Sequence, residues 1–181
     1  MNSKSLTKFK WFWAWQDEKE EAWLAEEARE GLHLQDVSPF GFYHFQKGQP
    51  GDYVYRLDFQ SLKARDRESY LQLFEDAGWE HIGDMGGWVY FRHKVSSAEL
   101  PEIYSDLESK IGKYQRVLGV LVILLPIMVI LLPDAYKVDS LGGLASVVVA
   151  VLSAVLLLLF SYAVIMLIRR INQLKKTASP N

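Results

Sequence analysis

EEAREGLHLQDVSPFGFYHF (residues 26–45) and LFEDAGWEHIGDMGGWVYF (residues 73–91) decide the fold of this chain. Each stretch has the end of a helix, a glycine, a short strand, a glycine-containing turn and an aromatic strand. Gly31 matches Gly78, and aromatic residues match in the second strands: Phe42 and Phe45 against Trp88 and Phe91. Because an aromatic strand and a helix precede each stretch, residues 1–95 are predicted to hold two copies of one β-α-β-β unit.

The repeat predicts an α+β fold: a duplicated β-α-β-β soluble domain with a mostly antiparallel sheet. In the first copy we expect a strand over residues 8–15, a helix from Asp17 to about Glu30, and strands near 32–37 and 40–46. In the second copy we expect a strand over 53–60, a helix over 65–78, and a hairpin of 79–85 with 88–94. Gly31 is expected to end the first helix in the left-handed conformation.

The segment KFKWFWAW, residues 8–15, alternates so that its three tryptophans share one face of the expected strand. Aromatic side chains pack well on a sheet, so we expect Trp11 and Trp13 to belong to the core. The alternative is that aromatic residues line a groove on the open face of the sheet or between the two halves. Trp11, Trp13, Arg56 and Asp58 are then candidate ligand-binding residues, although Arg56 and Asp58 are better explained as a solvated cross-strand pair.

Two later runs, residues 117–133 and 141–168, contain no charged residue and no histidine. A bilayer needs about 17–25 apolar residues, and a soluble helix of that length would carry a polar face. We therefore predict a transmembrane helix over each run, joined into a hairpin by an external loop at 134–140. A linker and juxtamembrane helix at 96–116 precede the hairpin, and a basic tail at 169–181 follows it.

The basic residues predict how the hairpin is oriented. Three basic residues precede the first run: Lys110, Lys113 and Arg116. Four follow the second run: Arg169, Arg170, Lys175 and Lys176. The loop between the runs has only one basic residue, Lys137. The positive-inside rule then places both termini in the cytoplasm of a multi-pass protein of the bacterial cell membrane. Small residues recur every fourth position in the second run and predict a helix-packing face: Gly142, Ser146, Ala150 and Ala154.

Composition narrows the functional classes. Through residue 110 there are 13 Lys and Arg against 20 Asp and Glu, a balance of −7, which argues against nucleic acid as a partner. The chain has no cysteine, its four histidines are scattered, and we find no catalytic or nucleotide-binding motif. We therefore expect no enzymatic activity, no cofactor and no metal site. Carboxylates such as Glu26 and Glu27 are expected on a solvated helix face.

The blocks FKWFWAWQDEKEEAWL, GFYHFQKG, YVYRLDFQ, LFEDAGWEHIGDMGGWVYF and ELPEIYSDLESKI resemble the bacterial family called domain of unknown function 2812. The resemblance covers roughly residues 8–111. It implies a soluble domain followed by membrane helices, and members often appear beside a PadR-type transcriptional regulator. It implies no activity, cofactor or site residue.

Two functions fit these features. The first is a non-enzymatic integral membrane protein whose cytoplasmic sensor or adaptor domain binds a small ligand or a protein. The second is an accessory or structural subunit of a membrane complex, with an interaction domain that binds no ligand. Expected partners are the lipid bilayer and either a membrane protein or a second copy, through the juxtamembrane helix and the hairpin. An aromatic groove between the two halves would favour the first function, and an exposed apolar patch on a fully packed domain would favour the second.

Overall fold

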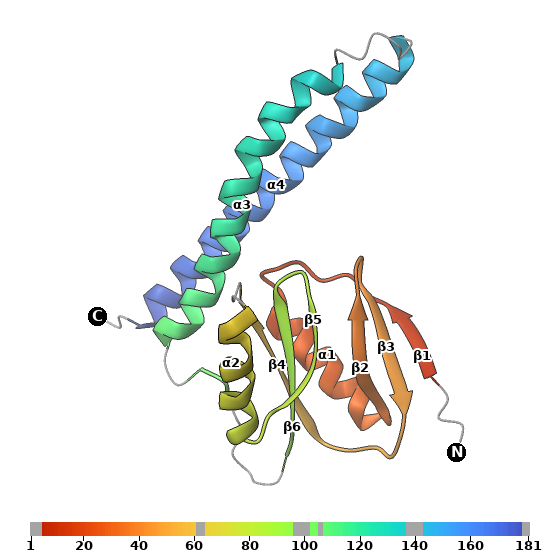
Figure 1. Cartoon of the computed structure of the whole chain (residues 1–181), viewed down its shortest axis with the longest axis vertical. Coiled ribbons are helices and arrows are strands. Elements are labelled where there is room, and N and C mark those ends of the chain that lie inside the picture. The colour runs from red at the N-terminus through yellow and green to blue at the C-terminus, as the bar shows by residue number, and fades with distance from the viewer. Residues whose placement is uncertain (1–4, 61–63, 96–101, 105–106, 137–142, 179–181) are drawn as a thin grey trace. The chain divides into compact units, whose positions relative to one another are not determined.

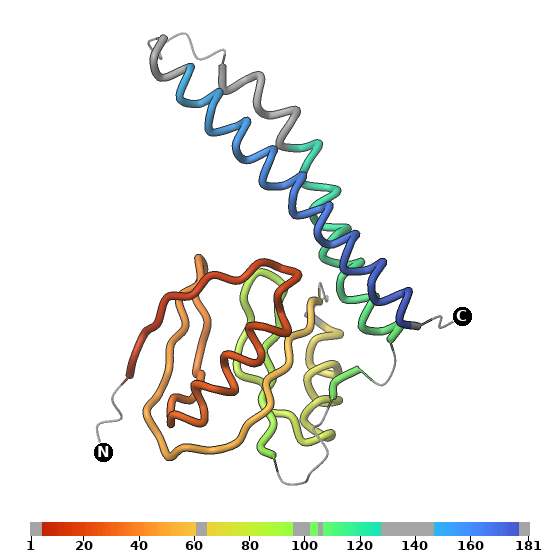
Figure 2. The backbone as a smooth tube through the Cα atoms, turned by 180° about the vertical axis from the view of Figure 1, so that it is seen from behind, coloured from red at the N-terminus to blue at the C-terminus, as the bar shows by residue number. Residues whose placement is uncertain are grey.

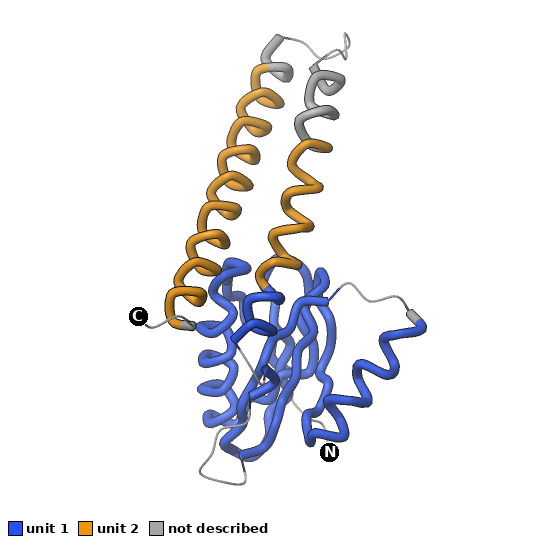
Figure 3. Tube along the Cα trace, turned by 90° about the vertical axis from the view of Figure 1, so that its left-hand side faces the viewer, with its two compact units in different colours: residues 1–113 blue, residues 114–181 orange. Residues whose placement is uncertain are grey.

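The computed structural model describes residues 5–60, 64–95, 102–104, 107–136 and 143–178, with side chains described for fewer of them around 64, 128–136 and 143–146. The chain divides into two compact units, Met1–Lys113 and Tyr114–Asn181 (Figure 3). Unit 1 includes Glu102–Tyr104 and the first turns of the helix that starts at Leu107, which the sequence assigned to a linker and a juxtamembrane helix.

Unit 1 has the predicted α+β class and contains the β-α-β-β order twice (Figure 1). The first copy is β1 (Ser5–Phe9), α1 (Asp17–Arg29), β2 (Leu32–Ser38) and β3 (Phe42–Lys47). The second copy is β4 (Tyr53–Phe59), α2 (Ala64–Asp76), β5 (Glu80–Met85) and β6 (Trp88–Lys94). The strands form two antiparallel three-stranded sheets with the same connectivity, ordered β1-β3-β2 and β4-β6-β5.

The two copies agree in their irregular features as well as in their order. The pairing shifts between Leu34 and Asp36 in one copy and between His81 and Gly83 in the other, which are equivalent places in the repeat. The helices have 13 residues each, and both are followed by a glycine of positive φ, 82° at Gly31 and 84° at Gly78. A bulge and a left-handed glycine are specific local choices, so their recurrence supports the duplication.

Among the described residues of unit 1, buried side chains form a cluster on each side of β4. In the first, α1 packs against β2 and β4 (Figures 1 and 2). The fully buried members of this cluster are Leu24, Ala28, Leu34, Phe45, Tyr55, Leu57 and Tyr90. In the second, α2 covers Val54, Trp79, Val89 and Phe91 with Tyr70, Leu71 and Phe74. Helix α1 therefore packs against strands of both copies, and β4 contributes one face to each cluster.

The expected strand over residues 8–15 is wrong. Strand β1 ends at Phe9, which pairs with Phe42 at the start of β3, so no partner strand continues beyond this point. Residues 10–16 are irregular, with a turn closed by the Gln16 N–H, which donates to the Trp13 carbonyl at 2.7 Å. The prediction that Trp11 and Trp13 are core residues is wrong for the same reason: Trp11 is 52% exposed, and Trp13 is half-buried outside both clusters.

Unit 2 holds two helices side by side. Helix α3 (Leu107–Tyr136) begins in unit 1 and continues into unit 2, where α4 (Gly143–Ala178) follows. The Arg170 guanidinium lies 5.7 Å from the centre of the Tyr114 ring, and Leu167 and Ile171 are buried.

Among the described residues one helical segment, Val147–Thr177, is long and apolar enough to cross a membrane, judged by length and composition alone. The other predicted span, 117–133, has described side chains only as far as residue 127. Of the small-residue face, Ala150 and Ala154 lie on α4, whereas Gly142 and the Ser146 side chain lie outside the described part.

Candidate ligand site

Helix α1 presents acidic side chains to the interior of unit 1. Asp17, Glu20, Glu21 and Glu27 are all buried, so the expected solvated face is wrong for Glu27. The acids were expected on the surface because charged residues seldom face a core without a partner. Here α1 packs against strands of both halves, so these four acids face protein, whereas Glu26 stays exposed.

Three of these four carboxylates have a cationic partner. Glu27 accepts from Lys8 Nζ at 2.5 Å, Glu21 Oε2 lies 3.5 Å from an Arg56 nitrogen, and Asp17 forms a short ion pair with Lys113. Lys113 lies near the start of α3, in the part of that helix that belongs to unit 1, and its side chain is almost fully buried. The buried pairs explain how α1 tolerates the acids.

Two side chains of these ion pairs also bond the backbone of β4 along its edge away from β6. The Leu57 N–H donates to Glu21 Oε1 at 2.9 Å, and Lys113 Nζ donates to the Leu57 carbonyl at 3.1 Å. An edge strand offers backbone groups that need partners, and here a carboxylate and an ammonium supply them. Glu21 and Lys113 therefore fix α1 and the start of α3 to β4.

Burial raises the pKa of Glu21 from its ordinary 4.5 to about 7, although Lys113, the Leu57 amide and Arg56 oppose the shift. A carboxyl with a raised pKa binds a proton in the folded state at a pH where the unfolded chain has lost it. The contribution of Glu21 to stability therefore rises as pH falls from about 7 to about 4.5, and is lowest above pH 7. The shift corresponds to about 3 kcal/mol.

We expect Glu21→Gln to remove this pH dependence. The free energy of unfolding of the parent minus that of the variant should rise by up to about 3 kcal/mol between pH 8 and pH 4.5. The measurement is unfolding followed by tryptophan fluorescence at several pH values, which reports unit 1 because all six tryptophans lie in it. Parallel profiles for parent and variant would contradict the raised pKa.

Glu20 is bound by one tyrosine from each half of unit 1. Tyr43 Oη donates to Glu20 Oε1 at 2.7 Å, and Tyr90 Oη donates to the same oxygen at 2.8 Å. Tyr43 lies on β3 and Tyr90 on β6, which are equivalent strands of the two copies, although Tyr90 matches His44 and Tyr43 matches Val89 in the repeat. Burial raises the pKa of Glu20, partly opposed by the two tyrosines, and burial beside Glu20 raises the pKa of both tyrosines.

Glu20 and Asp17 lie at a cavity of about 300 Å³ whose walls come from both halves. We call it the aromatic cavity, because seven aromatic residues line it: Trp11, Phe12, Trp13, Phe40, Tyr43, Trp88 and Tyr90. The remaining lining residues are small or belong to the two hairpin turns: Ala14, Gly41, Met85 and Gly86. A mostly apolar cavity with a few convergent polar groups is typical of a small-molecule site.

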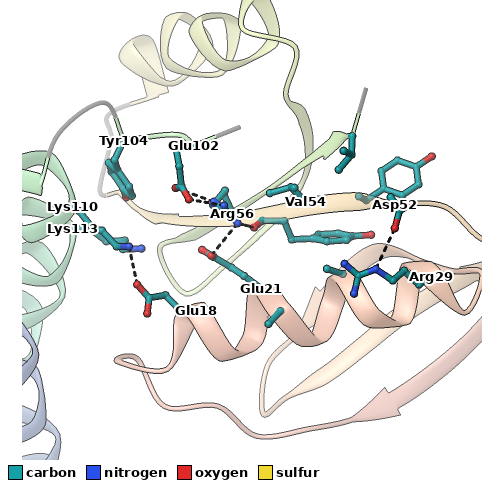
Figure 4. A pocket seen from close by; sticks show the side chains of 15 residues that line it. Glu18, Glu21, Arg29, Asp52, Val54, Arg56, Glu102, Tyr104, Lys110 and Lys113 are labelled. Atoms are coloured by element: carbon teal, nitrogen blue, oxygen red, sulfur yellow. Dashed lines mark hydrogen bonds and ion pairs between the residues drawn. The ribbon is translucent and has the colours of Figure 1, made fainter. Parts of the chain in front are cut away.

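A second hollow, of about 320 Å³, lies between α1 and β4 and is here called the Arg56 cleft (Figure 4). Its charged side chains form ion pairs with one another. Arg56 binds Glu102 at 2.6 Å and faces Glu21, and the remaining pairs are Lys110–Glu18 at 2.7 Å and Arg29–Asp52 at 3.2 Å. Because these charged groups are already paired within the protein, the cleft is a weaker candidate for a ligand site than the aromatic cavity.

The four residues that the sequence suggested as ligand-binding lie in three different places in the structure. Trp11 and Trp13 lie together in the aromatic cavity, and Arg56 lies in the cleft. Asp58 is buried and accepts from Gln60 at 2.8 Å, from Tyr70 at 2.9 Å and from Tyr104. The expectation of a solvated Arg56–Asp58 pair is therefore wrong.

Sequence reasoning missed Glu20, Tyr43, Tyr90 and Trp88. In the sequence, Glu20 stands among the acidic residues that begin the first helix, and the tyrosines stand in aromatic strands, which by themselves indicate no site. The repeat gives no signal for the two tyrosines, because aligning Phe42 and Phe45 with Trp88 and Phe91 pairs Tyr43 with Val89 and His44 with Tyr90. The described residues include no group of three or more His, Cys, Asp or Glu that could hold a metal ion.

Comparison with known families adds one finding. The family model described as protein of unknown function (DUF2812) matches residues 16–126, more than half of the chain. The chain belongs to the DUF2812 family. The DUF2812 match runs from the residue before α1 into α3, so it includes Glu20, Tyr43, Trp88 and Tyr90 but begins after Trp11 and Trp13. Searches of curated proteins and of solved structures found no match.

Proposed function

We propose that this DUF2812 protein is a non-enzymatic, membrane-anchored sensor or adaptor whose unit 1 binds a small ligand in the aromatic cavity. The observation that carries the proposal is that β3 and β6, strands of different copies, both contribute walls to one cavity. A ligand there would contact both halves of the duplicated domain. Its binding energy would then depend on how the halves are placed, which is what a sensor requires.

A second candidate is an accessory or structural subunit of a membrane complex whose unit 1 is a ligand-free interaction domain. It is favoured by three exposed aromatic side chains near the β1–β3 edge: Phe9, Phe40 and Phe42. Exposed apolar groups that gather on a surface are typical of interaction sites. The partner would be a membrane protein or a second copy, contacted also through α3 and α4.

The membrane anchor is proposed to be a hairpin, with α4 and the run 117–133 both crossing the bilayer and both termini in the bacterial cytoplasm. The apolar segment Val147–Thr177 supports membrane association. The basic residues on both sides of the hairpin support the orientation.

Cysteine labelling tests this orientation, because the chain has no cysteine of its own. A membrane-impermeant thiol reagent applied to intact cells should label Asp134→Cys and leave Ser3→Cys unlabelled. Labelling of Ser3→Cys with protection of Asp134→Cys would reverse the proposed orientation.

Binding to the aromatic cavity is tested by comparing two exposed aromatic residues of one segment. Trp11 lines the cavity, whereas Phe9, 64% exposed, packs its ring on Phe42 at 5.4 Å outside the lining. A panel of small cationic, neutral and anionic fragments of equal size would be screened against the full chain by saturation-transfer NMR. We expect a class of fragments that binds the parent and Phe9→Ala, and loses most of its signal with Trp11→Ala.

The reverse outcome is equally clear. If no fragment binds, or if Trp11→Ala and Phe9→Ala retain equal signals, the aromatic cavity is not a ligand site and the interaction-domain function is favoured.

A further inference from the structure

Glu20 differs from the other buried acids of α1 in its charge balance. Asp17, Glu21 and Glu27 each have a Lys or Arg partner, but within the residues that the structure describes Glu20 has no cationic partner. Its relative exposure is only 7%. A buried carboxylate without a counter-charge is costly, so a cation supplied from outside would be bound favourably.

The hydrogen bonds of Glu20 leave room for such a cation. Both tyrosines donate to Oε1, and in the described part of unit 1 no donor is found for Oε2. A carboxylate has about four acceptor sites on its two oxygens. Tyr43 and Tyr90 therefore hold the carboxylate in place while the second oxygen stays available.

The walls of the aromatic cavity suit the same kind of ligand. Aromatic rings carry negative charge on their faces and attract ammonium groups, and cages of such rings recognise quaternary ammonium ions. The Lys10 ammonium shows this attraction within the chain, since it lies 5.5 Å from the centre of Phe12 and 4.7 Å from that of Trp23. Phe12 is itself a wall of the cavity.

Resting on the proposed function, we infer that the ligand of the aromatic cavity is a small organic cation, an alkylammonium whose positive group lies beside Glu20. The aromatic residues supply the contact area and exclude water, and Glu20 supplies the charge. An anion would meet the carboxylates of Glu20 and Asp17, and a hard metal ion would find apolar rings where it requires oxygen ligands. A neutral ligand would leave the Glu20 charge uncompensated.

The test compares choline with its neutral carbon isostere, 3,3-dimethylbutan-1-ol, which has the same shape. Binding to the full chain in a non-ionic detergent is measured by calorimetry in phosphate buffer, which contains no competing amine. We expect choline to bind at least about tenfold more tightly than the isostere. Glu20→Gln keeps the shape and should lose this preference, whereas Glu26→Gln, an exposed acid of the same helix, should keep it.

Equal affinities for choline and the isostere would overturn the cation inference and leave the aromatic cavity standing as a site for a neutral ligand. A choline preference that survives Glu20→Gln would also overturn it. If neither probe binds the parent, the inference fails, and the fragment panel with Trp11→Ala and Phe9→Ala decides separately whether the cavity binds anything.

Discussion

Replacing Lys113 with alanine is expected to lower the free energy of unfolding of unit 1 by about 3–5 kcal/mol. The side chains of Lys113 and its partner Asp17 are 2% and 1% exposed, so removing the ammonium leaves a buried carboxylate without its counter-charge. The Leu57 carbonyl at the edge of β4 loses a donor at the same time. Unfolding of the full chain, followed by tryptophan fluorescence, measures the loss.

Lys110 provides the matched control, because it lies three residues earlier on the same helix and pairs with the same end of α1. Its ion pair with Glu18 is 27% and 47% exposed, so Lys110→Ala should cost no more than about 1 kcal/mol. If Lys113→Ala costs as little as Lys110→Ala, the start of α3 is not held in unit 1 by the buried pair.

The second large effect is expected from one core phenylalanine in each copy. Phe45 packs against Trp23 with ring centres 5.7 Å apart, and Phe91 stacks on Phe74 at 4.3 Å. Both rings are fully buried, so Phe45→Ala and Phe91→Ala should each cost about 3–5 kcal/mol. Because these residues match in the repeat, the two losses should be similar.

Phe9→Ala is the control, since this exposed ring should cost less than about 1 kcal/mol. The same fluorescence-detected unfolding compares all three variants. A tolerated change at Phe45 or Phe91 would show that one copy does not depend on its own core.

Local patterns were sufficient to predict most elements of unit 1. The alternating aromatic strands, Gly31 and Gly78 identify the repeat, because each pattern depends on a few neighbouring residues. The bounds of α1 follow from its acidic start and from Gly31 at its end. These features are local, so no knowledge of tertiary contacts is needed.

Sequence patterns gave wrong predictions where contacts between distant segments determine the end of a strand or the burial of a side chain. Alternation over residues 8–15 fits a strand, but β3 begins at Phe42, so the pairing ends once the Lys10 N–H has donated to the Gly41 carbonyl. The buried acids of α1 look solvated until β4, from the other copy, is placed against them. Glu20 acquires its role only when Tyr43 and Tyr90 come together from the two halves.

The account depends most on the claim that the tryptophan segment forms the wall of a ligand cavity and is not part of the core. Trp13 is half-buried, stacks on Trp15 with ring centres 5.3 Å apart and meets Trp11 at 5.8 Å. Losing such ring contacts costs about 0.5–1.5 kcal/mol each, less than losing a core aromatic residue.

The most direct test is the free energy of unfolding of Trp13→Ala, measured beside Phe91→Ala in the full chain. We predict a loss of about 1–3 kcal/mol for Trp13→Ala, from its two ring contacts, and a larger loss of about 3–5 kcal/mol for Phe91→Ala. If Trp13→Ala loses as much stability as Phe91→Ala, the segment is part of the core and the aromatic cavity is not a binding site.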